Sequence, residues 1–288
     1  MNQPIRQHWV PKVYLSNFAT EESKLAKSPQ AYVLNVKSGE EFVASIDNIL
    51  LQKHLYTIGK NDAAPNFVIE RTLSLIEGAA AASLKSMAVG EPVHCDKQQR
   101  VLVSYFLATL IMRTPRILVR QKRGFDSLAN DPASSLPEHL RGDDHREKVK
   151  VVNDWYQSLD ETGQHLVFLK SLVSTAGIIA ADLRKKGWSL FLAEDSFYIS
   201  SDDPVVLYHS TERRYGVGTP GVSLHVAISP KVMLMLGDTD VANEVAIHKT
   251  PPTIVETMNH LIASNAERFA ISSTSFAPIK SAILAGRR

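Results

Sequence analysis

The sequence feature that most constrains the fold is a long segment, residues 101–112, that would be apolar on nearly every side of a helix. It reads VLVSYFLATLIM and follows Asp96, a favourable residue for capping the start of a helix. A helix without a polar face has no side that suits water, so we expect it to be buried among other elements. Pro115 predicts a kink or an end, because proline lacks the amide hydrogen that a continuing helix uses.

Other periodic segments predict the elements that surround this helix. We expect a helix over 66–87 and further helices over 147–159, 163–186 and 251–266. The first of them carries an apolar stripe, made of Leu73, Ile76, Ala80, Leu84 and Met87.

Short runs of β-branched and aromatic residues predict strands. One run, AYVLNVK, lies at 31–37, and most of the others follow the long helices. The later runs are WSLFLA, SFYIS, PVVLYH, LHVAIS, VMLMLG and RFAIS. Because helices and strands are segregated along the chain, the predicted class is α+β, with a core of about five helices, a C-terminal antiparallel β-region and an N-terminal strand or strap. We expect a single domain over 1–288, with a flexible, polar excursion at 127–146.

Composition narrows the classes of function. The hydrophobic and charged fractions, 44% and 22%, are ordinary for a globular protein, and a net charge of +2 does not by itself indicate binding to nucleic acid or membrane. Cys95 is the single cysteine, which excludes an intramolecular disulfide and a cysteine-rich zinc site and fits a reducing compartment. No uninterrupted apolar run reaches roughly 18 residues, so we expect no membrane span and a cytoplasmic location.

The segment FYISSDDPVV, residues 197–206, places polar side chains where a predicted strand ends. Such residues commonly face a cleft, and Asp202 there could bind a metal, accept a proton or anchor an arginine, with Ser201 beside it. The alternative is that Ser-Asp-Asp-Pro only stabilises a turn, and turns of this kind are common.

Arg113 lies at the end of the buried apolar segment and needs an anionic partner, either from the protein or from a ligand. Glu77 borders the apolar stripe of the preceding helix, as does Glu70 two turns earlier, and either could be that partner. A structural ion pair and a substrate clamp remain open alternatives.

Arginines continue beyond Arg113 at helical spacing, as Arg116, Arg120 and Arg123. On a continuing helix they would form one basic stripe that could grip phosphates, although such a stripe is more often a solvated face. No aromatic residues alternate with them, which gives little support to stacking on single-stranded nucleic acid.

Histidine and glycine motifs exclude several enzyme classes. No HExxH spacing, no Walker loop, no dinucleotide fingerprint and no GxSxG elbow occurs, so the chain shows no nicotinamide or flavin motif. A divalent metal stays compatible with the sequence. His8, beside Trp9 and Pro11, is a candidate base or metal ligand, with simple packing as its alternative.

These separate segments resemble the DUF4238 family, a group of largely bacterial proteins without an established function. HWVPKVYLSNFA is similar to the family's HxxPxxYLxxF signature, and Asn17 fits its usual NF pair. IMRTP at 111–115 and ISSDDP at 199–204 are similar to its Rtp and tSDnP segments, with Asp203 where asparagine is common. AISP and NHLIASNAERFAIS are similar to its closing strand and final helix. The resemblance implies that His8, Arg113, Ser201 and Asp202 converge on one site.

The aperiodic opening segment is then expected to be a strip laid across a cleft, with His8 and Asn17 facing inward. In the alternative it is a strap whose polar groups only cap neighbouring backbone. The first function predicted is a hydrolase for a phosphodiester or nucleotide, with His8, Asp202, Arg113 and Glu77 as catalytic groups. Its substrate would be bound by Asn17, Ser201, Arg116 and Arg120. The second is a non-catalytic protein or sensor that binds a small anionic ligand; nucleic acid is also a compatible partner.

Overall fold

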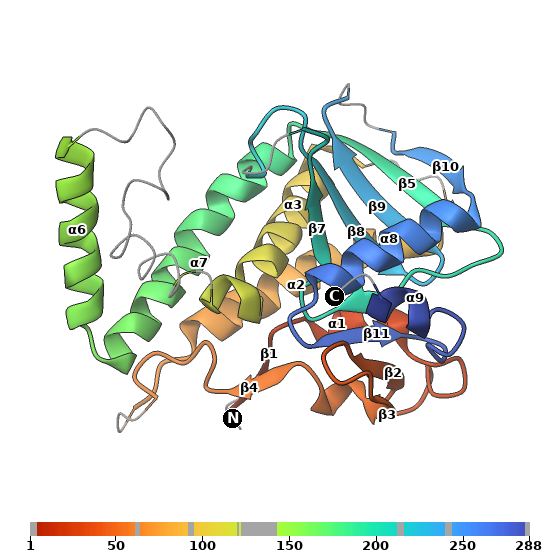
Figure 1. Ribbon diagram of the computed structural model, residues 1–288, viewed down its shortest axis with the longest axis horizontal. Helices are drawn as coiled ribbons and strands as arrows, with labels where there is room; N and C mark the ends of the chain where they lie inside the picture. Colours follow the sequence, from red (N-terminus) through yellow and green to blue (C-terminus); the bar gives the residue numbers. More distant parts are fainter. Residues whose placement is uncertain are drawn as a thin grey trace.

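The computed structural model describes residues 5–60, 64–91, 95–119, 121, 143–211, 216–239 and 244–285, which form an α+β fold (Figure 1). The helices are α1 (Lys12–Leu15), α2 (Val68–Ala88), α3 (Lys97–Met112), α6 (Asp143–Ser158), α7 (Glu161–Leu183), α8 (Pro252–Asn265) and α9 (Lys280–Ala285), with 3₁₀ turns η1 (Ser16–Phe18) and η2 (Ile46–Asn48). The predicted fold class is confirmed. Of the expected excursion, residues 127–142 lie outside the described residues, and 143–146 belong to α6.

The strands form three sheets. They are β1 (Arg6–His8), β2 (Gln30–Asn35), β3 (Glu41–Ser45), β4 (Leu51–Lys53), β5 (Gly187–Ala193), β6 (Ser200–Ser201), β7 (Val205–Tyr208), β8 (Ser223–Ser229), β9 (Val232–Gly237), β10 (Ala246–Thr250) and β11 (Phe269–Ser272). The largest sheet has the order β10-β5-β9-β8-β7, a second has the order β3-β2-β11-β6, and β1 pairs with β4. All pairs are antiparallel except β10 with β5, so one edge of the expected antiparallel region is parallel.

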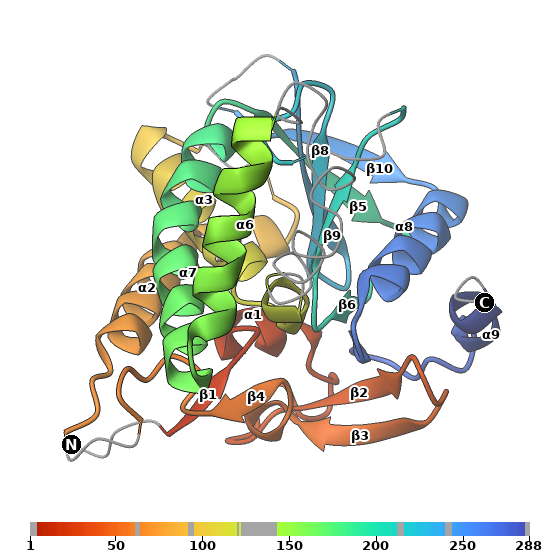
Figure 2. The ribbon, with the colours of Figure 1, turned by 60° about the vertical axis from the view of Figure 1, so that its left-hand side comes forward.

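The large sheet is the middle of three layers. Figure 2 shows α2, α3 and α7 on one side of it and α8 on the other. Successive residues of a strand point to opposite faces of the sheet. The paired residues Phe191 and Met233 face α8, so the neighbouring pair, Leu190 and Leu234, faces the other side and is fully buried there. The four-stranded sheet lies below these layers and joins the N-terminal β2 to the C-terminal β11 (Figure 1).

Helix α3 behaves as its sequence predicts. Asp96 and Gln99 form a reciprocal capping box, in which the main-chain amide of Gln99 donates to Asp96 Oδ1 at 2.8 Å. The helix ends at Met112, and Pro115 opens a new helical turn over 115–119. Arg113 therefore caps the end of α3 and does not share a continuous helix with Arg116, so the expected single basic stripe is wrong from its first member. Arg120 and Arg123 lie outside the described residues.

Helix α7 is the one helix of the described residues that is long and apolar enough to cross a membrane by length and composition. Its most apolar window has a mean hydropathy of 1.7, and a third of that window is buried. The helix packs along α3 through its apolar side. The buried residues on that side are Phe168, Leu169, Leu172, Ala176, Ala180 and Leu183. Such packing is typical of a core helix.

Candidate functional site around Arg113

The side chain of Arg113 lies deep in the protein at the end of α3. The residue is only 1% exposed, and its main-chain amide donates to the Thr109 carbonyl at 3.1 Å. Nη1 donates to Glu77 Oε1 at 2.8 Å. Nε and Nη2 are buried and have no hydrogen-bond partner. A buried guanidinium with two unpaired donors is costly, because each lost water contact is worth on the order of 1–3 kcal/mol when nothing replaces it.

Helix α2 places two carboxyl groups beside this guanidinium. Glu70 and Glu77 lie two helical turns apart and therefore on one face of α2, and both are half-buried. Burial, together with the smaller effect of the Glu77 charge, raises the pKa of Glu70 to about 7, although the charge of Arg113 acts in the opposite sense. Glu70 therefore exchanges its proton near neutral pH.

The strand pair β1–β4 supplies His8, the last residue of β1. Its Nε2 lies 3.3 Å from the Ile46 carbonyl oxygen. Because a carbonyl only accepts, this contact puts the proton on Nε2 and leaves Nδ1 as an acceptor in the neutral ring. Burial lowers the pKa of His8 to about 4, with smaller contributions in the same direction from the charges of Lys12 and Arg113. The ring is neutral at pH 7.

Tyr56 is the fifth residue of this group. It is 1% exposed, and its hydroxyl donates to the His8 carbonyl at 3.1 Å. Burial raises its pKa, and the charges of Arg113, Glu70 and Glu77 all act on it. Because these groups interact electrostatically with one another, we define the Arg113 site as His8, Tyr56, Glu70, Glu77 and Arg113.

The backbone around β1 and β4 holds this site in a fixed and partly strained shape. Buried Gln7 accepts from the Tyr56 amide at 2.6 Å and donates to the Thr57 hydroxyl at 3.3 Å, which fastens β1 to the chain beyond β4. Leu50 and His54, which flank β4, have φ values of 52° and 55°. Side chains with a Cβ rarely adopt such angles, and strain of this kind clusters at functional sites.

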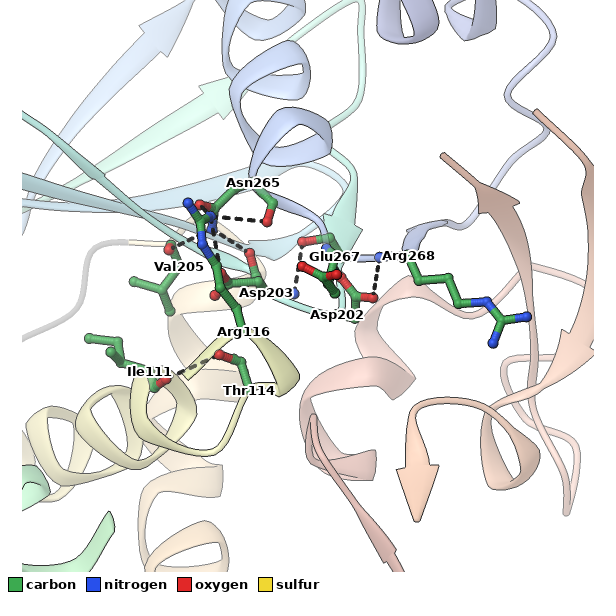
Figure 3. A network of polar contacts seen from close by, with 10 residues as sticks. Ile111, Thr114, Arg116, Asp202, Asp203, Val205, Asn265, Glu267 and Arg268 are labelled. Carbon is green, nitrogen blue, oxygen red and sulfur yellow. Dashed lines mark hydrogen bonds and ion pairs between the residues drawn. The ribbon is translucent and has the colours of Figure 1, made fainter. Parts of the chain in front are cut away.

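Asp202 lies in a second polar network (Figure 3). Its carboxylate accepts hydrogen bonds from the main-chain amides of Glu267, Arg268 and Phe269 at 2.8, 2.8 and 3.0 Å. Burial raises the pKa of Asp202, although these three amides oppose the rise. Ser201 accepts from the Asp203 amide at 3.2 Å. The Ser201 contact is the local turn chemistry of the alternative interpretation, whereas the contacts of Asp202 are long-range and brace the connection between α8 and β11.

Arg116 belongs to this second network as well. Its Nη1 donates to Asp203 Oδ2 at 3.4 Å and to the Asn265 carbonyl at 3.1 Å, and it also contacts Asn265 Oδ1 (Figure 3). The Asn265 side chain in turn donates to the Asp203 and Val205 carbonyls at 2.9 and 3.2 Å. Arg116 therefore ties the end of α8 to the turn between β6 and β7.

The opening segment is fastened to the large sheet by two of its polar side chains. Asn17 donates to the Ile228 carbonyl at 2.8 Å, and the Tyr14 hydroxyl donates to the Ala227 carbonyl at 2.6 Å. These two side chains strap the segment to β8, as the capping alternative predicts. His8, by contrast, is close enough to Arg113 for the guanidinium charge to contribute to lowering its pKa.

The structure thus brings together His8, Glu77 and Arg113, and it places Ser201, Asp202 and Arg116 in the neighbouring network. From the sequence, Glu70 is expected only as a partner for Arg113, and Tyr56 is not singled out because it lies in a segment without periodicity. Its one available signal is that a tyrosine in an otherwise polar stretch tends to be buried and hydrogen-bonded. Within the described parts of the chain, no three His, Cys, Asp or Glu side chains are grouped so as to hold a metal ion.

Comparison with known proteins identifies the family to which this sequence belongs. A model of the family described as "Protein of unknown function (DUF4238)" matches residues 6–276. No curated protein and no solved structure matches the chain. Because the match covers nearly the whole sequence, the chain belongs to the DUF4238 family, and the matched range contains every residue of the Arg113 site.

Proposed function

We propose that this member of the DUF4238 family hydrolyses a small phosphorylated substrate, of the phosphodiester or nucleotide class, at the Arg113 site. One observation carries the proposal: a buried guanidinium with two unpaired donors lies beside a carboxyl group whose pKa is about 7. The first of these features suits an anion, and the second suits proton transfer at neutral pH.

The two unpaired nitrogens of Arg113, Nε and Nη2, lie on the same edge of the guanidinium. Their N–H bonds are parallel, and this edge fits two oxygens of one phosphate or carboxylate group. Nη1, on the other side, is held by Glu77 at 2.8 Å. Glu77 therefore orients the guanidinium and leaves the bidentate edge for the substrate.

Glu70 is the group best suited to move the proton. General acid–base catalysis is most effective when the pKa of the group is close to the working pH, and the pKa of Glu70 meets this condition while that of His8 does not. The Glu70 carboxylate takes a proton from water as the water oxygen bonds to phosphorus. The bond from phosphorus to the leaving oxygen then breaks, and the protonated Glu70 returns the proton to that oxygen.

His8 contributes a neutral hydrogen-bond acceptor. With the proton on Nε2 and directed to the Ile46 carbonyl, Nδ1 accepts a hydrogen bond from the attacking water or from a substrate hydroxyl. His8, Glu70 and Glu77 are half-buried and so keep some contact with solvent, whereas Tyr56 and Arg113 are buried.

Binding without turnover is the second candidate function. It is favoured by the low pKa of His8, because Glu70 is then the one described member of the site that exchanges a proton near neutral pH. In that case the same guanidinium edge would hold an anionic ligand, and the protonation of Glu70 would set the affinity.

The test compares wild type with Arg113→Met, Glu70→Gln and Arg71→Met. Arg71 is an exposed arginine on α2 next to Glu70 and serves as the matched control. Hydrolysis of bis(p-nitrophenyl) phosphate and of nucleotides is followed, and calorimetry measures the binding of inorganic phosphate and nucleotides. We expect Glu70→Gln to lower kcat at least about 100-fold, Arg113→Met to abolish binding, and Arg71→Met to change neither.

The outcomes separate the two functions. Nucleotide that binds to wild type and is recovered intact after hours would favour the binding function over the hydrolase. If folded Arg113→Met bound these anions as tightly as wild type does, both functions would be lost together, because each depends on the guanidinium edge.

A further inference from the structure

A cavity lies between the five-stranded sheet and α8, on the opposite face of the sheet from α2 and α3. Its volume is about 140 Å³. Figures 1 and 2 show α8 crossing this face of the sheet. Three polar residues line the cavity: Tyr198, His225 and Thr250. None of them takes part in the Arg113 site.

Strand alternation explains why this face is rich in thioethers. Met233 and Met235 are two residues apart on β9 and so point to the same side, and His225 on β8 pairs with Met235. Helix α8 adds Met258 from above, and Phe191 pairs with Met233 from β5. Three methionines therefore contribute flexible, polarisable thioether side chains to the wall, and thioethers make favourable contacts with aromatic rings.

Two hydroxyl groups in this cavity have no hydrogen-bond partner other than each other. Tyr198 is fully buried and Thr250 is 4% exposed, and neither the Tyr198 hydroxyl nor Thr250 Oγ1 makes a hydrogen bond of normal geometry. The two groups lie close together in poor geometry, and the Thr250 hydroxyl, as a hydrogen-bond partner, lowers the pKa of Tyr198 against the larger, raising effect of burial. A buried hydroxyl without a partner is unfavourable, and a ligand carrying one polar atom would satisfy it.

The cavity also has an entrance. Ile254, on the first turns of α8, lines it and is 46% exposed. Phe191, Met235 and Met258 are half-buried, whereas Tyr198 and Met233 are buried. The polar pair therefore lies at the inner part of a cavity whose mouth is at α8.

We infer that this cavity is a binding site for a small, neutral, monocyclic aromatic molecule that carries one hydroxyl or N–H group. A dry cavity of about 150 Å³ holds one benzene ring, so a ring of this size fits the volume observed. The ring lies against the methionines, and its polar atom reaches the hydroxyls of Tyr198 and Thr250. No charged side chain lines the cavity among the described residues, so an ion would lose its hydration without compensation.

His225 is consistent with a neutral ligand. Its Nε2 lies 2.8 Å from the Ser223 hydroxyl. Burial lowers its pKa to about 4, which keeps the ring uncharged at pH 7. The site rests on the cavity and the two hydroxyls, and it is independent of the chemistry proposed at Arg113.

Phenol and toluene are the probes that test this inference, because they differ by the polar group alone. Calorimetry on the full chain should show phenol binding more tightly than toluene, and benzoate should not bind. In the double variant Tyr198→Phe, Thr250→Val, phenol affinity should fall about tenfold, as expected for the loss of one buried hydrogen bond, while toluene affinity stays the same.

Blocking the entrance provides a second, independent readout. Ile254→Trp should abolish binding of both probes, whereas Ile247→Trp, on β10 and outside the cavity lining, should leave both unchanged. The double variant is expected to fold, since it removes both hydroxyls together, leaves neither one behind, and breaks no hydrogen bond of normal geometry. Phenol that binds equally well to the double variant, or to Ile254→Trp, would overturn the inference.

Discussion

Replacing Glu70 by glutamine tests the electrostatics of the Arg113 site through stability alone. In the folded protein the pKa of this carboxyl is about 7, against an ordinary value of 4.5. Between these two pH values the folded state holds a proton that the unfolded state has released. The free energy of unfolding therefore falls as pH rises through this window, and the loss is complete above about pH 8. Glutamine cannot ionise, so the variant escapes this loss.

The expected size follows from the same shift. A pKa that rises by about 2.5 corresponds to about 3 kcal/mol if the group is fully shielded from water, because one pKa unit is about 1.4 kcal/mol. Glu70 is only half-buried, and solvent screening reduces this to about 1–2 kcal/mol. We expect the free energy of unfolding of Glu70→Gln minus that of wild type to increase by about 1 kcal/mol between pH 5.5 and pH 8, so that the variant gains relative stability.

Urea denaturation at pH 5.5, 6.5, 7.5 and 8.5 gives this difference directly. His8 and His225, whose pKa values burial lowers to about 4, make stability rise with pH up to about 6.5. Both proteins share these histidines, so their contributions cancel in the difference. Glu256→Gln, an exposed carboxyl on α8, is the control and should show no such trend. A difference between Glu70→Gln and wild type that is constant with pH would refute the assigned environment of Glu70.

Two further predictions concern the residues that brace the fold. Asp202→Asn should lower the free energy of unfolding by about 2–4 kcal/mol, because an amide group cannot accept all three main-chain hydrogen bonds from 267–269. Chemical denaturation measures this loss, and a variant as stable as wild type would contradict the bracing role. Tyr14→Phe should lower the free energy of unfolding by about 1–3 kcal/mol, because the Ala227 carbonyl loses the hydroxyl that donates to it. Its Tm should be lower than that of Tyr208→Phe, whose side chain is exposed, and equal Tm values would contradict this role of Tyr14.

The helical part of the fold could be predicted from sequence because its signals are local. The capping box at Asp96, the apolar segment after it and the proline at 115 together determine α3, and all lie within a few turns of one another. The pairing of β11 with β2 and the parallel pairing of β10 with β5 could not be predicted. They join segments far apart in the chain, and short strands carry no signal for their partner.

The candidate site was predicted where a buried charge demanded a partner. Arg113 follows an apolar helix, so a carboxylate near it was expected, and Glu77 fills that place. The position of Asp202 could not be predicted, because a carboxylate at a strand end suits a catalytic role and a main-chain cap equally well. Only the fold shows that the amides of 267–269 point at it.

The contrast between Arg113 and Arg116 gives the strongest reason to regard one of them as functional. The Arg116 side chain is 30% exposed, so those of its N–H groups that do not bind Asp203 or Asn265 can meet water. The Arg113 side chain is only 2% exposed. Its Nη1 binds Glu77, while its Nε and Nη2 have no hydrogen-bond partner. Replacing a buried ion pair by apolar residues is often neutral or stabilising, so bracing alone does not require an arginine here. An anion bound at the Nε–Nη2 edge would supply the missing hydrogen bonds. Anion binding therefore accounts for an arginine at this position better than bracing alone does.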